Sequence, residues 1–134
     1  MLNPYQTQTA KIIVIKEETA NIKLFKLDLK KSLFGRQKFV FRPGQIVMLS
    51  LPGFGEAPFA PCSDPKSKHL ELCVRKIGRL TEKLHSLRIG DKVGIRGPYG
   101  NGWPSTASQL KKNLLIVVGG LGLIPLRSLI LGRD

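Results

Sequence analysis

Two glycine-containing turns hold residue types that could bind a phosphate. The first follows the apolar run "NLLIVV" and contains Gly119, Gly120 and Gly122, after which "LIPLRSL" predicts the opening of a helix. Glycines let the backbone approach a phosphate closely, and a helix N-terminus offers free N–H groups and a positive dipole end. The spacing departs from the G-x-G-x-x-G pattern of dinucleotide-binding turns, and similar turns also join strands to helices without any ligand.

The second turn is "GRLTEKL" at residues 78–84. Gly78 permits close approach of a ligand, Leu80 lies within the turn, and Thr81 offers a hydroxyl that could also cap a helix. Such a helix would aim its N-terminus at an anion, and the preceding Arg75 could extend its guanidinium to the same phosphate. Taken alone, the stretch is explained more simply as a capped helix without a ligand.

Short strands separated by turn residues dominate residues 10–100 and would position the second turn. Residues 10–29 alternate around the polar "KEETAN" and predict a β-hairpin. Its apolar positions are Ile13, Ile15, Ile22, Leu24 and Phe25. Residues 31–39 predict a loop, and 39–53 predict a strand, a tight turn at Pro43-Gly44 and a second strand.

Three further stretches complete this part of the chain. Residues 54–68 carry three prolines and predict an irregular or edge segment, whereas 69–77 alternate clearly and predict a strand. A short helix is expected within 78–91, ended by Gly90, and another strand within 91–100. Many short strands with one late helix predict a mainly β chain folded as a small antiparallel barrel.

The character of the sequence changes after residues 101–112. The run "NLLIVVGG" is continuously apolar and bounded by glycines, which predicts a strand buried on both faces. This change predicts two domains, a barrel at 1–106 and, at 107–134, the first strand and helix start of an incomplete α/β domain. Without neighbouring strands, the strand at 114–118 should pack on the barrel or on a second copy of the chain, or lack order.

The chain has a formal net charge of +13, with 22 Lys and Arg against 9 Asp and Glu. Such a field favours an anionic partner, namely a nucleotide cofactor, an acidic protein or nucleic acid. The basic residues are scattered and lack the interleaved aromatic residues of a single-strand binder, so nucleic acid is the weakest of the three. A solvated, lysine-rich surface would also account for the charge.

Other residue types indicate neither a metal site nor side-chain catalysis. Cys62 and Cys73 have no standard zinc or iron–sulfur spacing, and Cys73 in an alternating stretch is expected to be a small buried apolar residue. His69 and His85 have no ligand-spaced partner. No apolar run approaches the roughly 20 residues of a membrane span, and the start lacks the layout of a secretory signal, so a cytoplasmic location is expected.

Five motifs in order carry a family resemblance: "RPGQIVMLSLP", "EAPFAPCSD", "LELCVRKIGRLTEKLHSL", "GDKVGIRGPYGNGWP" and "LLIVVGGLGLIPLRSLI". From about residue 10 onward the chain resembles the ferredoxin–NADP reductase superfamily, in particular its hydrogenase-gamma and dihydroorotate-dehydrogenase electron-transfer branch. The resemblance implies a Greek-key, FAD-binding barrel followed by a parallel-sheet NAD(P) domain. It also implies electron transfer between a nicotinamide nucleotide, flavin and an iron–sulfur partner.

The family's flavin motif, Arg-x-Tyr-Ser, aligns with residues 57–60, where Ala57 and Ala60 replace the arginine and the serine. The resemblance implies that Phe59 packs against the flavin ring and that Cys62 and Ser63 supply polar contacts in place of the lost hydroxyl. It also places the FAD pyrophosphate on the second turn and the start of the nicotinamide domain at the first. The implied cofactor-binding residues are Pro58, Phe59, Ala60, Cys62, Ser63, Arg75, Gly78, Leu80, Thr81, Gly119, Gly120 and Gly122.

The leading hypothesis is therefore the flavin-binding module of an FAD- and NAD(P)-dependent oxidoreductase, with no catalytic side chain. Relatives of this kind continue for roughly another domain, so NAD(P) binding would require a further domain, and the sequence is either a piece of a longer enzyme or a shortened flavin module. Expected partners are an acidic redox protein or iron–sulfur subunit, or a second copy joined through 114–118. Alternatives are a flavin-free docking or scaffold barrel, motivated by Ala57 and Ala60, and a nucleic-acid-binding barrel.

Overall fold

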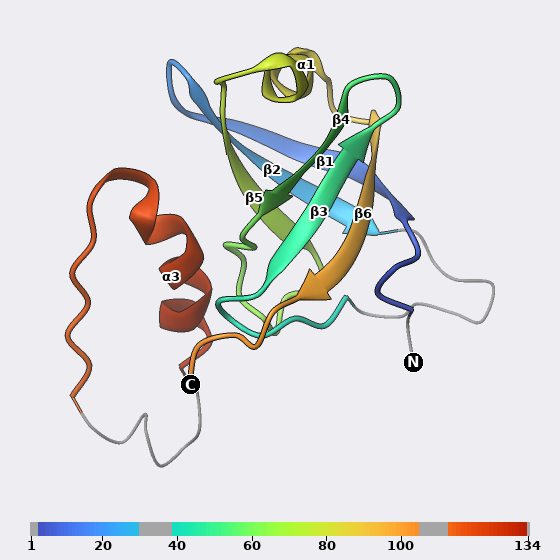
Figure 1. The fold of residues 1–134 in the computed structure, drawn as a ribbon. Helices are drawn as coiled ribbons and strands as arrows, with labels where there is room; N and C mark the ends of the chain where they lie inside the picture. The colour runs from blue at the N-terminus through green and yellow to red at the C-terminus, as the bar shows by residue number, and fades with distance from the viewer. Residues whose placement is uncertain (1–2, 30–38, 105–112, 134) are drawn as a thin grey trace.

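The computed structural model describes residues 3–29, 39–104 and 113–133. Six strands form the barrel, a short helix lies over one end of it, and a second helix lies against its side (Figure 1). The elements are β1 (Gln8–Thr19), β2 (Ile22–Leu29), β3 (Ile46–Leu51), β4 (Gly55–Phe59), β5 (Leu70–Arg75), α1 (Arg79–Ser86), β6 (Lys92–Tyr99), the 3-10 turn η1 (Gly120–Gly122) and α3 (Leu123–Leu131).

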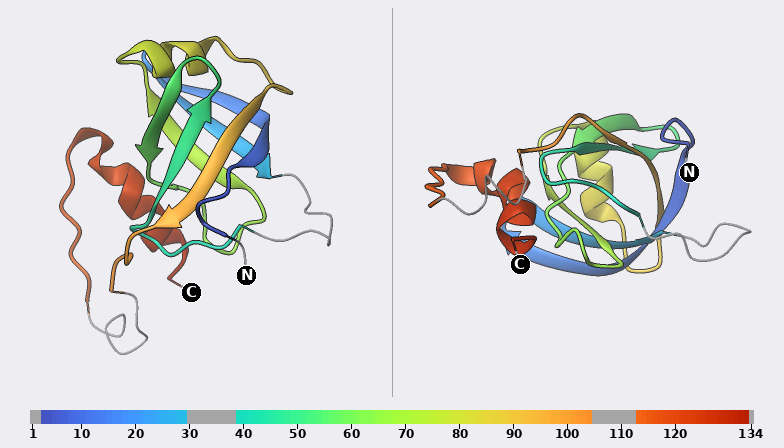
Figure 2. Two further views of the ribbon diagram at one scale, coloured as in Figure 1. Left: turned by 45° about the vertical axis from the view of Figure 1, so that its right-hand side comes forward. Right: turned by 90° about the horizontal axis from the view of Figure 1, so that it is seen from below.

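The strands are antiparallel and lie in the order β4-β3-β6-β1-β2-β5. Strands distant in sequence are therefore neighbours, as in a Greek key, because β3 pairs with β6 and β2 pairs with β5. The two edges approach one another where Pro61, just after β4, forms a bridge to Leu72 of β5. Seen along its axis, the barrel is a closed ring (Figure 2). The prediction of a mainly β, antiparallel barrel is confirmed.

Alternate residues of each strand fill the barrel interior, as the twofold period of a strand requires. On β3 the buried positions are Val47, Leu49 and Leu51, with half-buried residues between them. The remaining core residues are Ala10, Ile12, Phe25, Leu27, Phe39, Phe41, Leu70, Leu72, Val74, Leu84, Val93 and Ile95. Each large apolar side chain removed from water contributes about 1.5–3 kcal/mol, so this interior holds the strands in register.

The hairpin at residues 8–29 differs from its prediction in two details. The polar residues "KEET" belong to β1, so the turn consists only of residues 20 and 21. An irregularity in the β1–β2 register between Ile12 and Val14 places Ile12 in the core at 0% exposure, while Ile13 is half-buried. A bulge of this kind shifts the alternation by one residue, which the sequence pattern does not show.

Two other boundaries are also corrected. Phe39 and Phe41 are buried but lie outside any strand. The helix α1 has Gly78 as its N-cap and ends at Ser86, so Thr81 is its third residue and Gly90 lies beyond it. The edge character predicted within 54–68 is confirmed, because this segment contains the edge strand β4, which accepts Pro58 since an edge position needs no second ladder bond. The predicted loop at 31–39 lies almost entirely outside the described residues.

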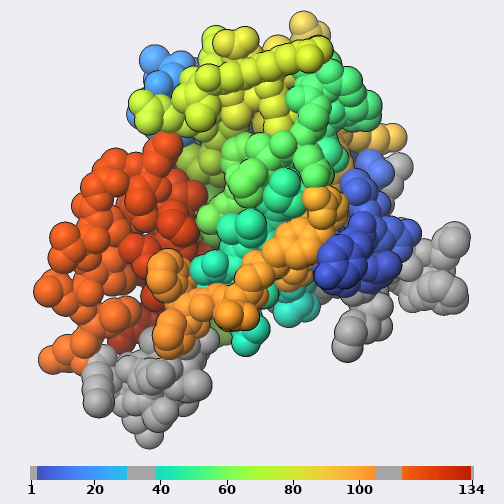
Figure 3. Space-filling model, viewed as in Figure 1, coloured from blue at the N-terminus to red at the C-terminus, as the bar shows by residue number. Residues whose placement is uncertain are grey.

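The predicted buried strand at 113–118 is wrong. These residues are extended without strand pairing, and the exposed fraction reaches 87% at Leu115 and 85% at Val117. Figure 3 shows this segment on the outer rim of the molecule, beyond α3. A parallel strand is buried only by strands on either side and helices on its faces, and among residues 3–29, 39–104 and 113–133 no strand lies beside it. The predicted helix after the glycines is confirmed as α3.

The turn before β3 is packed against residues that follow β6. Gly44 has φ +91°, and a Cβ built there would lie 2.7 Å from the Trp103 ring atom Cδ1. The Trp103 N–H donates to the carbonyl of Pro43 at 2.7 Å. Both the left-handed backbone and the close approach of the indole therefore require glycine at this position.

We expect Gly44→Ala to lower the melting temperature more than Gly53→Ala. Gly53 also has positive φ, at +82°, but a Cβ there would meet nothing within 4 Å. Gly53→Ala, the control, should therefore lower the free energy of unfolding only by the cost of a left-handed backbone at a residue with a side chain, about 1–2 kcal/mol. Gly44→Ala should lower it by roughly a further 1–3 kcal/mol, because the added methyl group overpacks against Trp103. Thermal unfolding of the two variants measures the difference, and equal losses would contradict the packing argument.

Candidate functional site

The turn that leads from β5 into α1 is shaped by the Thr81 side chain. Its hydroxyl accepts hydrogen bonds from the N–H groups of Ile77 and Gly78, both at 2.9 Å, and donates to the carbonyl of Gly78 at 3.0 Å. The residue is 8% exposed. The hydroxyl is thus committed to the turn, and Thr81 contributes to the site by fixing the backbone that precedes the helix.

The first helical turn leaves backbone N–H groups available. The first helical bond is donated by Glu82 to the carbonyl of Gly78 at 2.8 Å, so the N–H groups of Arg79, Leu80 and Thr81 have no carbonyl partner within the helix. A Cβ at Gly78 would meet nothing within 4 Å, and its φ of −168° is open to any residue. Neither packing nor backbone conformation requires glycine here, which leaves an open approach to these amides.

Positive charge surrounds this turn. The Arg79 guanidinium and the Lys83 ammonium each lie 5.3 Å from the centre of the Phe54 ring, which holds both cations beside the start of α1. Arg75 is exposed at the end of β5, as the sequence predicts for a residue leading into the turn. Leu80 is half-buried and packs against the core, so its side chain anchors the turn. The arrangement can bind an anionic group through backbone amides.

The edge strand β4 presents the residues aligned with the flavin motif. Ala57 pairs with Leu49, Pro58 with Met48 and Phe59 with Val47. Phe59 is half-buried against the core, and Pro58 is exposed. Because β4 pairs with β3 on one side only, its other side is an open edge along this segment.

Cys62 and Ser63, which the sequence analysis expects to supply polar contacts to the flavin, are both buried at the closure of the barrel. Cys62 is 0% and Ser63 1% exposed. The Cys62 N–H donates to the carbonyl of Glu71 at 2.9 Å, and the Ser63 hydroxyl accepts from the Glu71 N–H at 3.2 Å. These bonds join the segment after β4 to β5 and close the barrel, so the two side chains act on the fold.

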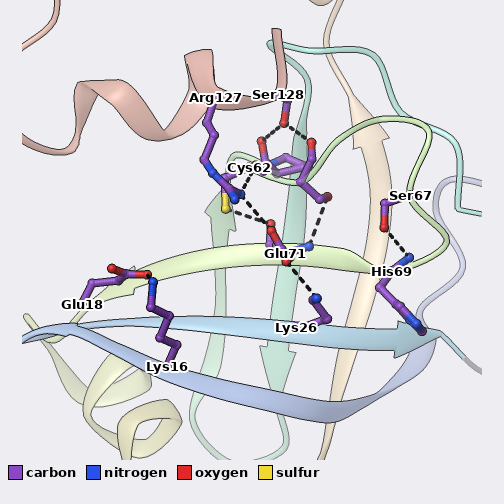
Figure 4. A network of polar contacts seen from close by, with 11 residues as sticks. Lys16, Glu18, Lys26, Cys62, Ser67, His69, Glu71, Arg127 and Ser128 are labelled. Atoms are coloured by element: carbon purple, nitrogen blue, oxygen red, sulfur yellow. Dashed lines mark hydrogen bonds and ion pairs between the residues drawn. The ribbon is translucent and has the colours of Figure 1, made fainter. Parts of the chain in front are cut away.

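A polar cluster that sequence reasoning missed joins α3 to this closing segment (Figure 4). The Arg127 Nη1 atom donates to the Cys62 carbonyl at 2.6 Å and to the Glu71 carboxylate at 2.8 Å. The Ser128 hydroxyl lies 2.8 Å from the Pro61 carbonyl oxygen and 2.7 Å from that of Ser63. The only sequence signal was the polar pair "RS" within the otherwise apolar "LIPLRSLIL".

Burial and charge shift the pKa values in this cluster. Burial raises the pKa of the Cys62 thiol to about 12, and it also raises that of Cys73. Burial alone would raise the pKa of the Glu71 carboxyl, but hydrogen bonds from Arg127 and Lys26 outweigh it and lower that pKa. Lys26 lies 3.3 Å from Glu71 on the side opposite Arg127, so the carboxylate sits between two cations.

The glycine turn at 119–122 lies beside a cavity of about 500 Å³. The outer faces of β1, β2 and β5 form one wall, and η1 and α3 form the other. Gly120 has φ +54°, whereas a Cβ at Gly119 or Gly122 would meet nothing within 4 Å. Within the part of the chain that the structure describes, no hydrogen bond or ion pair joins this turn to residues 77–82.

Among the described residues no three His, Cys, Asp or Glu side chains gather where they could hold a metal ion. Nor does any helix in those ranges have the length and apolar character needed to cross a membrane.

Residues 9–103 match the model of a family described as the oxidoreductase FAD-binding domain. The chain is 43% identical to sulfhydrogenase 2 subunit gamma of Pyrococcus furiosus, over 96% of this chain and 44% of that protein. It is 40% identical to a probable dihydroorotate dehydrogenase B (NAD(+)) electron transfer subunit of Methanocella arvoryzae, over 90% of this chain and 41% of that protein. The chain thus spans less than half the length of these curated relatives.

Solved structures share the fold. A cytochrome P450 reductase from Amycolatopsis matches with a TM-score of 0.74 and 25% identity, over 93% of this chain and 38% of that one. Ferredoxin-NADP+ reductase from Plasmodium falciparum matches with a TM-score of 0.74 and 15% identity, over 96% of this chain and 53% of that one. The second similarity establishes the fold alone.

We expect Cys62 to resist alkylation while the protein is folded. With its pKa at about 12, roughly one thiol in 10⁴ is ionised at about pH 8, and only the thiolate reacts. Cys73 is half-buried and should be modified first by iodoacetamide. Mass spectrometry after timed labelling reports both sites, and denatured protein is the control in which both react. Equal rates in the folded state would contradict the burial of Cys62.

We expect the Glu71–Arg127 pair to stabilise the protein at neutral pH and to be lost in acid. A carboxyl whose pKa is lowered by folding contributes stability above its ordinary value of 4.5, and loses it as the pH falls through the lowered value. Glu71→Gln should therefore lower the melting temperature at about pH 7, and the difference from wild type should shrink as the pH falls below 4.5. The exposed Glu82→Gln is the charge-matched control. A pH-independent difference would exclude the ion pair as the cause.

Proposed function

Because this chain belongs to the family of oxidoreductase FAD-binding domains, we propose that its barrel holds FAD as the flavin-binding module of an electron-transferring oxidoreductase. The observation that carries the proposal is the turn at 77–82. The space beside Gly78 holds no protein atom, and neither packing nor backbone conformation requires glycine at this position. The unpartnered amides at the start of α1 follow directly. This cradle fits a diphosphate, because backbone N–H groups and a helix N-terminus bind phosphate oxygens without a charged side chain.

We assign the pyrophosphate to the amides of residues 79–81, with Gly78 providing access and Thr81 fixing the turn. Arg75, Arg79 and Lys83 add positive charge around this position. Leu80 contributes its backbone N–H while its side chain holds the turn to the core. Backbone groups thus replace the phosphate-binding arginine that the chain lacks at Ala57.

We assign the flavin ring to the open edge of β4. Phe59 would offer an aromatic contact there, and Pro58 and Ala60 would line the approach. Ala60 offers no hydroxyl, and Cys62 and Ser63 are buried in the barrel closure. The polar partners that remain for the flavin ring are therefore backbone groups at the open edge of β4. Bound FAD would supply the hydride and electron chemistry, and the protein would bind and orient it. We assign no catalytic side chain.

We further propose that the chain is divided into a barrel at 1–106 and a nucleotide-binding unit that begins at 107. In this unit the glycine turn at 119–122 would bind the nucleotide. Gly119 and Gly122 border open space, as Gly78 does, so this turn is suited to a nicotinamide nucleotide once a full α/β domain surrounds it. The complete enzyme would pass electrons between NAD(P), flavin and an iron–sulfur protein or partner subunit. The relatives named as a sulfhydrogenase gamma subunit and an electron transfer subunit support this assignment.

The charge of +13 favours an acidic redox partner in the cytoplasm, where the two free cysteines would stay reduced. The exposed apolar residues at 114–118 supply a second surface. We propose that further polypeptide covers it, either the remainder of an α/β sheet or a second copy of this chain.

FAD uptake tests the proposal directly. Purified protein mixed with FAD and freed of excess cofactor should show the flavin absorption bands, shifted from those of free FAD, and a raised melting temperature. Protein that retains no flavin and melts at the same temperature with and without FAD would overturn it. Comparison with FMN reports whether the pyrophosphate turn is used, because FMN has no second phosphate to occupy it.

We expect Gly78→Ala to weaken FAD binding about tenfold or more, a loss of at least ~1.4 kcal/mol, because the added methyl group occupies the approach to the amides. The melting temperature without FAD should stay near wild type, since no protein atom lies within 4 Å of that methyl group. Ser86→Ala at the other end of α1 is the control for changes in the helix. Unchanged FAD affinity in Gly78→Ala would remove the turn from the site.

A further inference from the structure

The segment that closes the barrel, residues 60–63, is held from two sides. On the barrel side, Pro61 bridges to Leu72, and the N–H of Cys62 donates to β5. These contacts leave the carbonyl oxygens of Pro61, Cys62 and Ser63 to partners outside the sheet. All three residues are buried, so their carbonyls need protein partners in place of water.

The second side is α3, which reaches all three carbonyls through two adjacent side chains. Arg127 takes the middle one at 2.6 Å, and the Ser128 hydroxyl lies within 2.8 Å of the two that flank it. Ser128 is 0% exposed, so water cannot replace it. The same Arg127 nitrogen also binds the Glu71 carboxylate of β5. Figure 4 shows both side chains directed from α3 onto this segment.

The contacts join two parts of the chain that are separated in sequence by residues 64–122, and they add to the packing of Leu129 and of Gly132 beside Pro65. Residue 60 follows Phe59 of β4 directly, and α3 begins one residue after Gly122. A displacement of about 1 Å would take hydrogen bonds of this length out of range. The helix and the closing segment therefore keep one fixed register, with Arg127 and Ser128 as the link.

We propose that Arg127 and Ser128 are positioning residues that hold the 60–63 segment, and through it Phe59, in register with the helix of the glycine turn. The assignment of FAD to β4 and of a nucleotide to residues 119–122 rests on the proposed function. The link itself does not, because it consists of contacts within the protein. With FAD bound, the link sets the flavin ring at a fixed position relative to the glycine turn, where an error of about 1 Å matters for transfer between two bound groups.

Hydrogen exchange tests the link in protein without FAD. The variants are Arg127→Met and Ser128→Ala, and the control is Arg88→Met, which removes the same charge from an exposed residue after α1. We expect the Cys62 amide to exchange at least tenfold faster in both variants and at the wild-type rate in the control. The Ile12 amide is the internal reference, because it donates to the Asp91 carbonyl at 2.8 Å and lies on β1, which pairs with neither β4 nor β5. Wild-type exchange at Cys62, or equal acceleration at Ile12, would overturn the positioning role.

The second measurement uses protein loaded with FAD. We expect both variants to retain flavin with about tenfold weaker affinity, an altered visible circular dichroism spectrum and a shifted reduction potential, while Arg127→Lys lies between Arg127→Met and wild type. Wild-type values in both variants would overturn the connection to the flavin. If wild-type protein takes up no FAD, the proposed function fails, and the exchange data decide the link by themselves.

Discussion

The closure of the barrel depends on hydrogen bonds to one short segment, residues 60–63. Strands β4 and β5 are the two ends of the sheet order, and within the described ranges it is this segment that bridges them. Its N–H and side-chain groups bind β5, while its carbonyls bind Arg127 and Ser128 of α3. Because buried backbone groups must be paired, the helix is part of the barrel's own closure. The division that we propose, between a barrel at 1–106 and a unit beginning at 107, is therefore crossed by the contacts that complete the barrel.

The site is built mainly from backbone groups. The Thr81 hydroxyl and the Leu80 side chain both hold the turn before α1. The amides of residues 79–81 have no carbonyl partner within the helix, and they follow the open space at Gly78. A diphosphate needs oriented N–H groups and a positive field, and both are present without a dedicated arginine at position 57. On β4, Cys62 and Ser63 hold the strand end in place, and β4 is an end strand of the sheet.

The apolar residues at 114–118 are exposed because a strand is buried only when neighbouring strands pair with it. Their sequence is suited to the interior of a parallel sheet, yet the described residues supply strands only to the barrel, whose order is complete. Helix α3 nevertheless forms and docks, since it brings its own polar anchors to the barrel and buries Leu129. The relatives extend over more than twice the matched length, in agreement with our proposal that further polypeptide covers this surface.

Local patterns in the sequence determined the strands, the helix α1, the barrel class and the two glycine turns, because side-chain alternation and turn residues act over a few positions. The family resemblance of its ordered motifs pointed to FAD. Local patterns misplaced Ile12 and residues 114–118, whose burial depends on a bulge and on neighbours distant in sequence. The burial of Cys62 and Ser63 depends on the barrel closure, which no local pattern shows. The roles of Arg127 and Ser128 arose only in the tertiary structure, since their carbonyl partners lie more than 60 residues earlier in the chain. Sequence periodicity does not indicate a contact between a side chain and the backbone of a distant segment. The contacts of Arg127 and Ser128 therefore depend on tertiary packing alone.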